Sequence, residues 1–296
     1  MSVSVLMPVY NTRRAELQVA IESILDQTYK DFEFIIINDG STNDAEEVIL
    51  DYKDDRIKYY KNETNLKLIS TLNKGIDLCS GKYIARLDSD DYSEPDRLEK
   101  QVKVMEELPN VGLTGSFFRR VPENITITTP VRPDIIKLCQ RYVNNCVAHS
   151  SAMIRKSVLT ENNLRYNSYC VHAEDYKLWC DMSYVCDIVV IPETLITVKT
   201  NADGVSQSNL AWQRKMVTVI MMENMIRDFP CDKKYLYSVL FKYIEGTAVS
   251  DKEFEDMKDF LSKVTQYLQK VMGQYYSSDL IFRSIMSIPL YFVREK

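Results

Sequence analysis

Short apolar runs alternate with amphipathic segments through the first part of the chain. The apolar runs predict strands, which cover residues 3–7, 32–37, 57–60 and 83–87. Between them, apolar residues at helical spacing and suitable capping residues predict helices over residues 14–27, 44–52 and 66–78. Strand–helix repeats of this kind predict an α/β fold, in which a mostly parallel sheet is flanked by helices.

The pattern changes near residue 206. Before it, helices are predicted over residues 94–108, 133–142 and 156–161, strands over 111–118, 188–191 and 194–198, and a loop or hairpin over 119–131. After it, every segment is typical of a helix, over residues 211–228, 233–246, 252–272 and 278–292. We therefore expect an α/β domain over residues 1–206 and a C-terminal helical region over residues 207–296.

Polar turns follow three of the predicted strands. They are Tyr10-Asn11, Asn38-Asp39 and Asp88-Ser89-Asp90. In an open parallel sheet, ligands bind beyond the carboxyl ends of the strands. We expect the three turns to meet there and to form a ligand site.

Two acidic segments are candidates for chemistry. Asp88, Asp90 and Asp91 form a cluster of like charges, which persists when a cation or a polar ligand compensates it. On local pattern alone an acidic turn that caps a helix is an equal alternative, because Ser93-Glu94-Pro95-Asp96 follows. Glu174 and Asp175 begin another predicted helix, where acids are also favoured by the helix dipole.

Composition excludes some classes of function. The chain has 296 residues and a net charge of −5, so it lacks the basic face that nucleic-acid binding needs. Seven cysteines without a C-x-x-C pair favour free thiols in a reducing compartment over a zinc site or disulfides. Residues 3–5 begin as a core strand without an export signal, and the apolar stretch 284–293 is too short to span a bilayer. These features predict a cytoplasmic protein.

Two features leave alternatives open. The C-terminal helices are rich in Met and Tyr, which favours packing, but Phe282, Ile285 and Ile288 beside Arg283 also suit a peripheral contact with the inner membrane face or a homo-oligomer. His149 and His172 are the only two histidines. Each has either a structural role or a role in binding a ligand.

Several longer motifs together resemble family-2 glycosyltransferases with the GT-A fold, enzymes that use nucleotide-diphosphate sugars. The motifs are Val5-Leu6-Met7-Pro8-Val9-Tyr10-Asn11, Asp26-Gln27-Thr28-Tyr29, Asn38-Asp39-Gly40-Ser41-Thr42, Gly81-Lys82-Tyr83-Ile84-Ala85-Arg86-Leu87-Asp88-Ser89-Asp90-Asp91 and Ala173-Glu174-Asp175-Tyr176. Within the family, segments 149–156, 164–167 and 173–176 most resemble bacterial-type β-1,3-N-acetylglucosaminyl- and galactosyltransferases of surface oligosaccharide synthesis.

The resemblance implies roles for individual residues. Asp39 would accept a hydrogen bond from uracil, Asp90 would ligate Mn²⁺ or Mg²⁺, and Asp175 would be the catalytic base, with Glu174 as its neighbour. The remaining implied contacts to the UDP-sugar fall on Pro8, Val9, Tyr10, Asn11, Arg86, Asp88 and Ser89. Pro8, Val9 and Tyr10 would wall the uracil pocket, and Arg86 would donate to sugar hydroxyls.

The sequence departs from the family pattern in two places. Relatives often have Tyr-Arg-x-His where this chain reads Val198-Lys199-Thr200-Asn201, so Asn201 replaces a histidine that can ligate the metal. An amide oxygen is a suitable ligand for a hard cation. Lys67 stands where relatives often have Gly, and we expect it to approach the nucleotide. The Gln-x-x-Arg-Trp signature of processive members is absent, which predicts transfer of one sugar per encounter.

These features predict an inverting, non-processive glycosyltransferase. It would move a hexose or N-acetylhexosamine from a UDP-sugar to a hydroxyl of an oligosaccharide or glycolipid acceptor and form a β-glycosidic bond. One alternative is a sugar-1-phosphate nucleotidyltransferase, although residues 8–12 lack the Gly-rich basic loop that such an enzyme needs. The other is a UDP-sugar-binding protein with little turnover, which Asn201 suggests.

Overall fold

The computed structural model describes residues 1–200, 209–274 and 277–288. Its strands are β1 (Val3–Val9), β2 (Phe32–Asn38), β3 (Ile57–Lys61), β4 (Tyr83–Arg86), β5 (Tyr92–Ser93), β6 (Val111–Val121), β7 (Ile125–Ile127), β8 (Met153–Arg155) and β9 (Asp187–Lys199). Its helices are α1 (Arg14–Leu25), α2 (Ala45–Asp51), α3 (Leu68–Leu78), α4 (Arg97–Glu107), α5 (Pro133–Tyr142), α6 (Lys156–Glu161), α7 (Glu174–Met182), α9 (Leu210–Asp228), α10 (Lys233–Glu245), α11 (Asp251–Met272) and α12 (Ser278–Met286), with a short 3₁₀ helix η1 (His149–Ser151).

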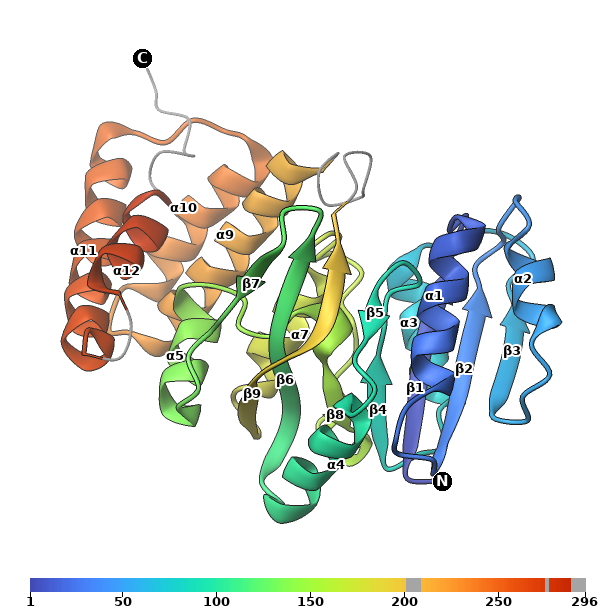
Figure 1. Cartoon of the computed structure of the whole chain (residues 1–296). Coiled ribbons are helices and arrows are strands. Elements are labelled where there is room, and N and C mark those ends of the chain that lie inside the picture. The colour runs from blue at the N-terminus through green and yellow to red at the C-terminus, as the bar shows by residue number, and fades with distance from the viewer. Residues whose placement is uncertain (201–208, 275–276, 289–296) are drawn as a thin grey trace.

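The described strands form one sheet with the order β3-β2-β1-β4-β8-β6-β9-β5, and β7 pairs with β6 (Figure 1). The first four strands are parallel. Strands β1 and β2 are buried along their whole length, which explains why their sequences are almost continuously apolar. The predicted α/β fold with flanking helices and C-terminal helices is therefore confirmed.

The second half of the sheet is mixed. Strand β8 is antiparallel to both β4 and β6, whereas β9 is parallel to β6. The two strands predicted over residues 188–191 and 194–198 are one strand, β9, because the register shifts past Pro192 and Glu193 and pairing with β6 resumes at Thr194. A bulge at this point accommodates a proline, which has no N–H to donate to the ladder. The loop or hairpin expected over residues 119–131 is the β6–β7 hairpin.

Two hydrophobic cores lie on opposite faces of the sheet. One packs Val5 and Met7 of β1 against α1, α2 and α4. The other begins at Leu6 on the opposite side of β1 and continues through α3, α5 and α7 into α9, α10, α11 and α12. The C-terminal helices, which lie beyond α5 in Figure 1, therefore share a core with the α/β part of the chain.

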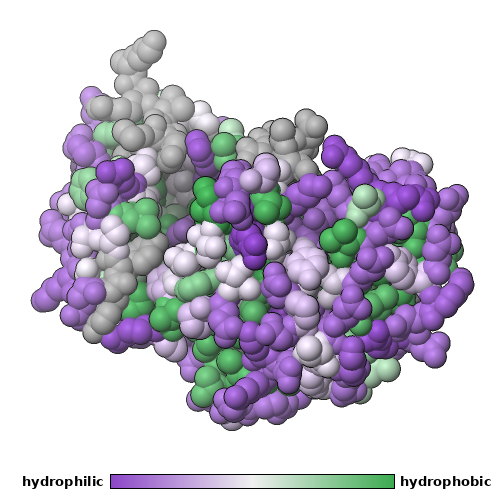
Figure 2. Space-filling view, in the orientation of Figure 1, coloured by the Kyte–Doolittle hydropathy of each residue, from purple (hydrophilic) through white to green (hydrophobic). Residues whose placement is uncertain are grey.

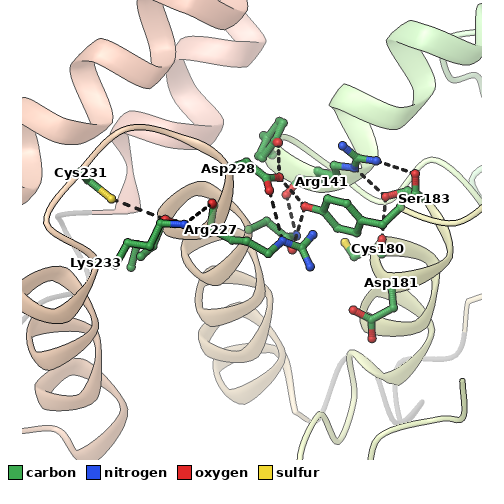
Figure 3. A network of polar contacts seen from close by, with 12 residues as sticks. Arg141, Cys180, Asp181, Ser183, Arg227, Asp228, Cys231 and Lys233 are labelled. Carbon is green, nitrogen blue, oxygen red and sulfur yellow. Dashed lines mark hydrogen bonds and ion pairs between the residues drawn. The ribbon is translucent and has the colours of Figure 1, made fainter. Parts of the chain in front are cut away.

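A polar network joins α9 to α5 and to the segment after α7 (Figure 3). Asp228 Oδ2 accepts hydrogen bonds from the hydroxyls of Tyr142 and Tyr184, each at 2.5 Å. The Tyr184 ring lies between two guanidinium groups, with Arg141 Cζ at 3.7 Å and Arg227 Cζ at 3.2 Å from its centroid. One carboxylate thus joins α9 to both α5 and the segment after α7.

We expect Asp228→Ala to lower the free energy of unfolding by about 1–3 kcal/mol, because two tyrosine hydroxyls lose their shared acceptor. Urea unfolding checks this. The control is Asp259→Ala, which removes a carboxylate from an exposed pair with Lys263 and is expected to cost less than about 1 kcal/mol. Equal effects of the two substitutions would mean that the network does not stabilise the packing of α9.

The surface drawn in Figure 2 is mostly hydrophilic, with hydrophobic residues in small separate groups. None of the described helices has the length and apolar character that crossing a bilayer requires. On the C-terminal helices, Phe241, Tyr267, Leu280 and Phe282 are exposed. A membrane or oligomer contact through these helices stays a prediction. Of the helix predicted over residues 278–292, the part from residue 289 on lies outside the described residues.

Candidate active site

The loops after β1, β2 and β4 meet at the carboxyl ends of these strands. Strand β4 pairs with β1 although β2 and β3 come between them in the sequence, so this is the point where the strand order reverses. Asn11 donates its N–H to Ser41 Oγ at 3.0 Å, and its Oδ1 accepts from the Thr42 N–H at 2.8 Å. The hydroxyls of Thr12 and Ser89 are 2.6 Å apart. The structure brings the three predicted turns together.

Asp39 lies at the end of β2 with 3% of its surface exposed. Its Oδ1 accepts hydrogen bonds from Asn62 Nδ2 at 2.7 Å and from the Leu66 N–H at 2.9 Å. Gly40 follows with φ +72°, and a Cβ there would stand 2.7 Å from the Thr64 carbonyl carbon. The loop after β3 is therefore packed against Gly40 so closely that only glycine fits at position 40.

Pro8 and Val9 are buried beside Asp39, and the Asp39 N–H donates to the Val9 carbonyl at 2.8 Å. Tyr10 is 49% exposed at the same edge. A buried carboxylate next to apolar residues and an exposed aromatic ring is a chemically suitable environment for a planar base with N–H donors.

The acidic cluster after β4 contains three different carboxyl groups. Asp88 accepts from Arg86 Nη2 at 2.6 Å and lies 2.7 Å from Ser150 Oγ. Burial opposes ionisation of Asp88, but Arg86 and the bond from Ser150 outweigh it and lower its pKa to about 2. Burial and the neighbouring Asp88 charge raise the pKa of Asp90 to about 6.

Asp91 is turned inward and is 4% exposed. It accepts the Lys199 N–H at 2.9 Å, and its Oδ2 lies 2.5 Å from Ser150 Oγ. Burial and the charges of Asp88 and Asp90 raise the pKa of Asp91 well above its ordinary value. Because Ser150 has one hydroxyl proton and two carboxyl neighbours, a proton on Asp91 satisfies the second contact. Asp91 is therefore a structural acid that joins β9 to the cluster.

The described side chains at this site would supply only part of the coordination shell of a divalent cation. The described residues contain no group of three His, Cys, Asp or Glu side chains in position to hold a metal. Asp90, however, carries a carboxyl group whose ionisation is opposed by burial and by Asp88, and a cation would relieve both effects. Mg²⁺-type ions commonly take one or two carboxylates and complete their shell with substrate phosphates and water. The donor set therefore fits a metal that arrives with a diphosphate.

The second acidic segment lies at the first turn of α7. Asp175 Oδ2 accepts from Asn145 Nδ2 at 2.9 Å, and Oδ1 accepts from the Tyr176 N–H at 2.7 Å. Burial raises the pKa of Asp175 to about 6, and the Asp88 charge adds to this effect. Burial and the Asp175 charge raise the pKa of Glu174 to about 7. A helix dipole would stabilise the charged form of these acids, but their pKa values are raised. Two such groups at one helix start are therefore candidates for a functional site.

Buried side chains connect the two acidic segments. Trp179 of α7 donates Nε1–H to the Val147 carbonyl at 3.1 Å and packs edge-on against His149. His149 Nε2 lies 2.9 Å from the Tyr166 hydroxyl. Burial and the Arg86 charge lower the pKa of His149 to about 3, so this ring is neutral and structural. His149, Tyr166 and Trp179 therefore pack together as one group beside the acidic segments.

The other predicted site residues are placed as follows. Arg86 is 1% exposed, bonds Leu87 O and Asp88, and leaves its buried Nε without a partner. Lys67 is exposed directly before α3 with φ +71°, a conformation that suits the glycine of relatives. His172 also has a positive φ, +68°, and burial lowers its pKa. Asn201 lies outside the described residues.

Three residues of the site were not predicted from the sequence. Ser150 bridges Asp88 and Asp91, Asn145 holds Asp175, and Lys199 contacts Asp91 through its N–H and Glu16 through its Nζ at 2.7 Å. The polar run His149-Ser150-Ser151 directly before an apolar strand was the one local signal for Ser150. The others depend on long-range contacts.

A pocket of about 370 Å³ opens beside Asp175. Its walls come from the loop after α5, from the start of α7, and from α9 and the end of α12. Gln213 of α9 donates Nε2–H to the His172 carbonyl at 3.0 Å, so α9 supports the backbone three residues before Asp175. The volume of this pocket is within the range of small-ligand pockets.

Comparison with known proteins places this geometry in a family. Residues 4–162 match glycosyl transferase family 2. The chain is similar to an uncharacterized glycosyltransferase of Methanocaldococcus jannaschii, with 39% identity over 184 residues that cover 60% of this chain and 63% of that protein. It is also similar to the O-antigen biosynthesis glycosyltransferase WbnJ of Escherichia coli, with 33% identity over 225 residues, which cover 71% of this chain and 84% of that protein.

The fold likeness extends over the C-terminal helices. The crystal structure of S. aureus TarS 1–349 in complex with UDP matches with a TM-score of 0.63 and 15% identity, and the match covers 97% of this chain and 90% of that one. The overall arrangement is thus the GT-A fold that the sequence motifs predict. The chain belongs to glycosyl transferase family 2 and is a glycosyltransferase. This membership confirms the predicted family and class of enzyme and excludes the nucleotidyltransferase alternative.

Proposed function

We propose that this glycosyltransferase moves one hexose or N-acetylhexosamine from a UDP-sugar to a hydroxyl of a saccharide acceptor, with inversion, and forms a β-glycosidic bond. The observation that supports this most is that the acidic segment after β4 and the acidic start of α7 are near enough to interact electrostatically. Asp88 is close enough to raise the pKa of both Asp175 and Glu174. A donor at Asp88 and Asp90 would therefore present its anomeric carbon toward Asp175.

The donor side would hold the nucleotide and the sugar. Asp39 would accept from uracil through Oδ2, since its bonds with Asn62 and the Leu66 N–H are made by Oδ1. Pro8, Val9 and Tyr10 would surround the base, with Asn11 at the edge of the pocket. The ribose or the sugar would contact Asp88 and Ser89, and the sugar hydroxyls would lie near Arg86. Lys67, which is exposed directly before α3, would approach the nucleotide.

Mn²⁺ or Mg²⁺ would be held by Asp90, with Asn201 as a further ligand in our proposal, and when bound it supplies positive charge that stabilises the departing diphosphate. The chain's own residues do the rest. Asp175 takes the proton from the acceptor hydroxyl, whose oxygen attacks the anomeric carbon. The bond from that carbon to the diphosphate oxygen breaks, and its electron pair leaves with UDP. Asn145 and the Tyr176 N–H hold the Asp175 carboxyl in place.

The direct test measures UDP release from UDP-GlcNAc, UDP-Gal, UDP-GalNAc and UDP-Glc with Mn²⁺ or Mg²⁺, with and without oligosaccharide or glycolipid acceptors. We expect one donor to give acceptor-dependent UDP release, and NMR of the product to show a single added β-linked sugar. Tight UDP binding without turnover of any pair would instead support a UDP-sugar-binding protein with little turnover. An α-linked product would contradict inversion.

The pH dependence of transfer follows from Asp175. A base with a raised pKa of about 6 is protonated and inactive below that pH, so kcat/KM should be about tenfold lower at pH 5 than at pH 7. The measurement is the pH profile at saturating metal, with UDP affinity measured over the same range as a control. Glu174→Gln should leave the acid limb near pH 6, because Glu174, with its pKa raised to about 7, is itself mostly protonated at that pH. An acid limb near pH 4 in the unmodified enzyme would argue against a perturbed Asp175 as base.

A further inference from the structure

The pocket beside Asp175 is built jointly by the catalytic part and the C-terminal helices. Helix α9 contributes Gln213, Val217 and Met221 at intervals of four residues, and Arg214 and Thr218 at the same interval one position on. Side chains four residues apart lie on one face of a helix, so this face of α9 is directed at the pocket. The end of α12 closes the pocket with Ser284, Ser287 and Ile288.

The lining combines an apolar floor with polar groups at the rim. Val143, Val217, Met221 and the buried Ile288 offer apolar surface, whereas Asn144, Gln213 and Ser287 offer hydrogen-bond donors and acceptors. Saccharides have apolar C–H faces and hydroxyl edges, so they suit a pocket of this composition. Because the pocket also contains Asp175, a saccharide bound here would place a hydroxyl near the proposed base.

Arg214 distinguishes this pocket from a neutral sugar site. It is exposed at the pocket, and within the described part of the chain it makes neither a hydrogen bond nor an ion pair. Other surface arginines do find carboxylates, as Arg14 does with Asp44 at 2.7 Å and Arg56 with Asp54 at 2.7 Å. In a chain with a net charge of −5, carboxylates are plentiful. Because Arg214 pairs with none of the described carboxylates, its guanidinium is available to a ligand.

The chemistry of the lining indicates which ligand group Arg214 would take. The pocket already holds one carboxyl group, that of Asp175, and burial lowers the pKa of His172, so His172 contributes no charge near neutral pH. Among the described lining residues Arg214 is therefore the one full positive charge. A guanidinium binds phosphate and carboxylate oxygens in a bidentate manner, and such charge-assisted bonds are about twice as strong as neutral ones.

We propose that the pocket between the start of α7 and helices α9 and α12 binds the acceptor, and that Arg214 selects an acceptor saccharide with an anionic substituent, a phosphate or a carboxylate. This inference rests on the proposed function, because it takes Asp175 as the base that faces the acceptor. It assigns to the C-terminal helices the choice of acceptor, and to the loops after β1, β2 and β4 the binding of the donor.

The test compares neutral and charged acceptors on the full chain. The probes are methyl β-galactoside and methyl β-glucoside, their 6-phosphates and their uronates. Binding of each probe to the UDP- and Mn²⁺-loaded protein is measured by calorimetry and by ligand-observed NMR. We expect the unmodified protein to bind a phosphate or uronate probe roughly ten- to hundredfold more tightly than its neutral counterpart. Preference for the phosphate over the uronate, or the reverse, identifies the anionic group.

The variants are Arg214→Ala, which should remove the preference, and Arg214→Lys, which should keep part of it because the charge stays but the bidentate fork is lost. Lys234→Ala is the matched control, since it removes one exposed positive charge on α10 away from the pocket and should leave the preference intact. UDP affinity and acceptor-independent UDP release should be the same in every variant.

Three results would overturn the inference. The first is equal or weaker binding of the charged probes by the unmodified protein. The second is an unchanged preference in Arg214→Ala, and the third is a loss of UDP affinity in that variant, which would place Arg214 on the donor. Failure of the proposed function would show differently, as absence of donor turnover with all acceptors, and the binding measurements would still report on Arg214.

Discussion

Asp175→Asn is expected to lower kcat for transfer by at least about a hundredfold while it leaves the affinity for UDP and metal nearly unchanged. A positioned general base contributes roughly 10²–10⁴-fold to rate, and asparagine keeps the size of the side chain but cannot take the proton. The contacts with Asn145 and the Tyr176 N–H show that the side chain is held rather than mobile, so the loss would be chemical and not one of folding. Steady-state kinetics and UDP calorimetry on the same preparation make the comparison.

Glu174→Gln is the matched control for this substitution. It makes the same change from carboxyl to amide at the neighbouring residue, which is 7% exposed, and it leaves the proposed base in place. We expect a much smaller fall in kcat than for Asp175→Asn. If Asp175→Asn lowered UDP affinity and transfer together, Asp175 would be a structural residue of the α7 start.

Asp90→Ala is expected to abolish the part of UDP affinity that depends on metal. In the unmodified protein, Mn²⁺ should strengthen UDP binding at least tenfold, and chelation by EDTA should reverse this, because the ion joins a carboxylate to the diphosphate. In the variant, UDP affinity should be the same with Mn²⁺ and with EDTA. Calorimetric titration of UDP under both conditions gives the answer.

The control for the metal prediction is Asp91→Asn. Asp91 is buried, bonded to the Lys199 N–H and to Ser150, and its pKa is raised, so an amide can replace the protonated carboxyl with its contacts kept. Metal-dependent UDP affinity should stay close to that of the unmodified protein. If metal dependence survived in Asp90→Ala and was lost in Asp91→Asn, Asp91 rather than Asp90 would be the metal ligand.

The sequence predicted the donor side of the site well because that part depends on local order. Strands β1, β2 and β4 are short apolar runs that end in polar turns, and parallel pairing alone brings the turns to one edge. Local pattern alone did not separate Asp90 from Asp91, and the assignment of the metal to Asp90 came from the family resemblance. They are adjacent in the chain, and they differ only because Ser150 and the Lys199 N–H, both remote in sequence, turn Asp91 inward.

The acceptor side was harder to predict because it depends on packing between distant segments. The helical periodicity of residues 211–228 predicted α9 almost to the residue, yet periodicity did not show that Gln213 would bond the loop before Asp175. Similarly, the sequence suggested two strands where β9 is one, since pairing with β6 continues beyond the bulge at Pro192. Local pattern predicted the elements, and tertiary contacts decided which side chains they present.

The shared core of α5, α7 and α9 has a consequence for the design of chimaeric enzymes. Exchange of the segment after residue 206 with that of a relative would cut through a continuous apolar core and through the Asp228 network. It would also separate Gln213 from the His172 carbonyl. If the pocket binds the acceptor as we propose, acceptor preference is therefore better changed by substitutions on the face of α9 that lines it than by exchange of the whole segment.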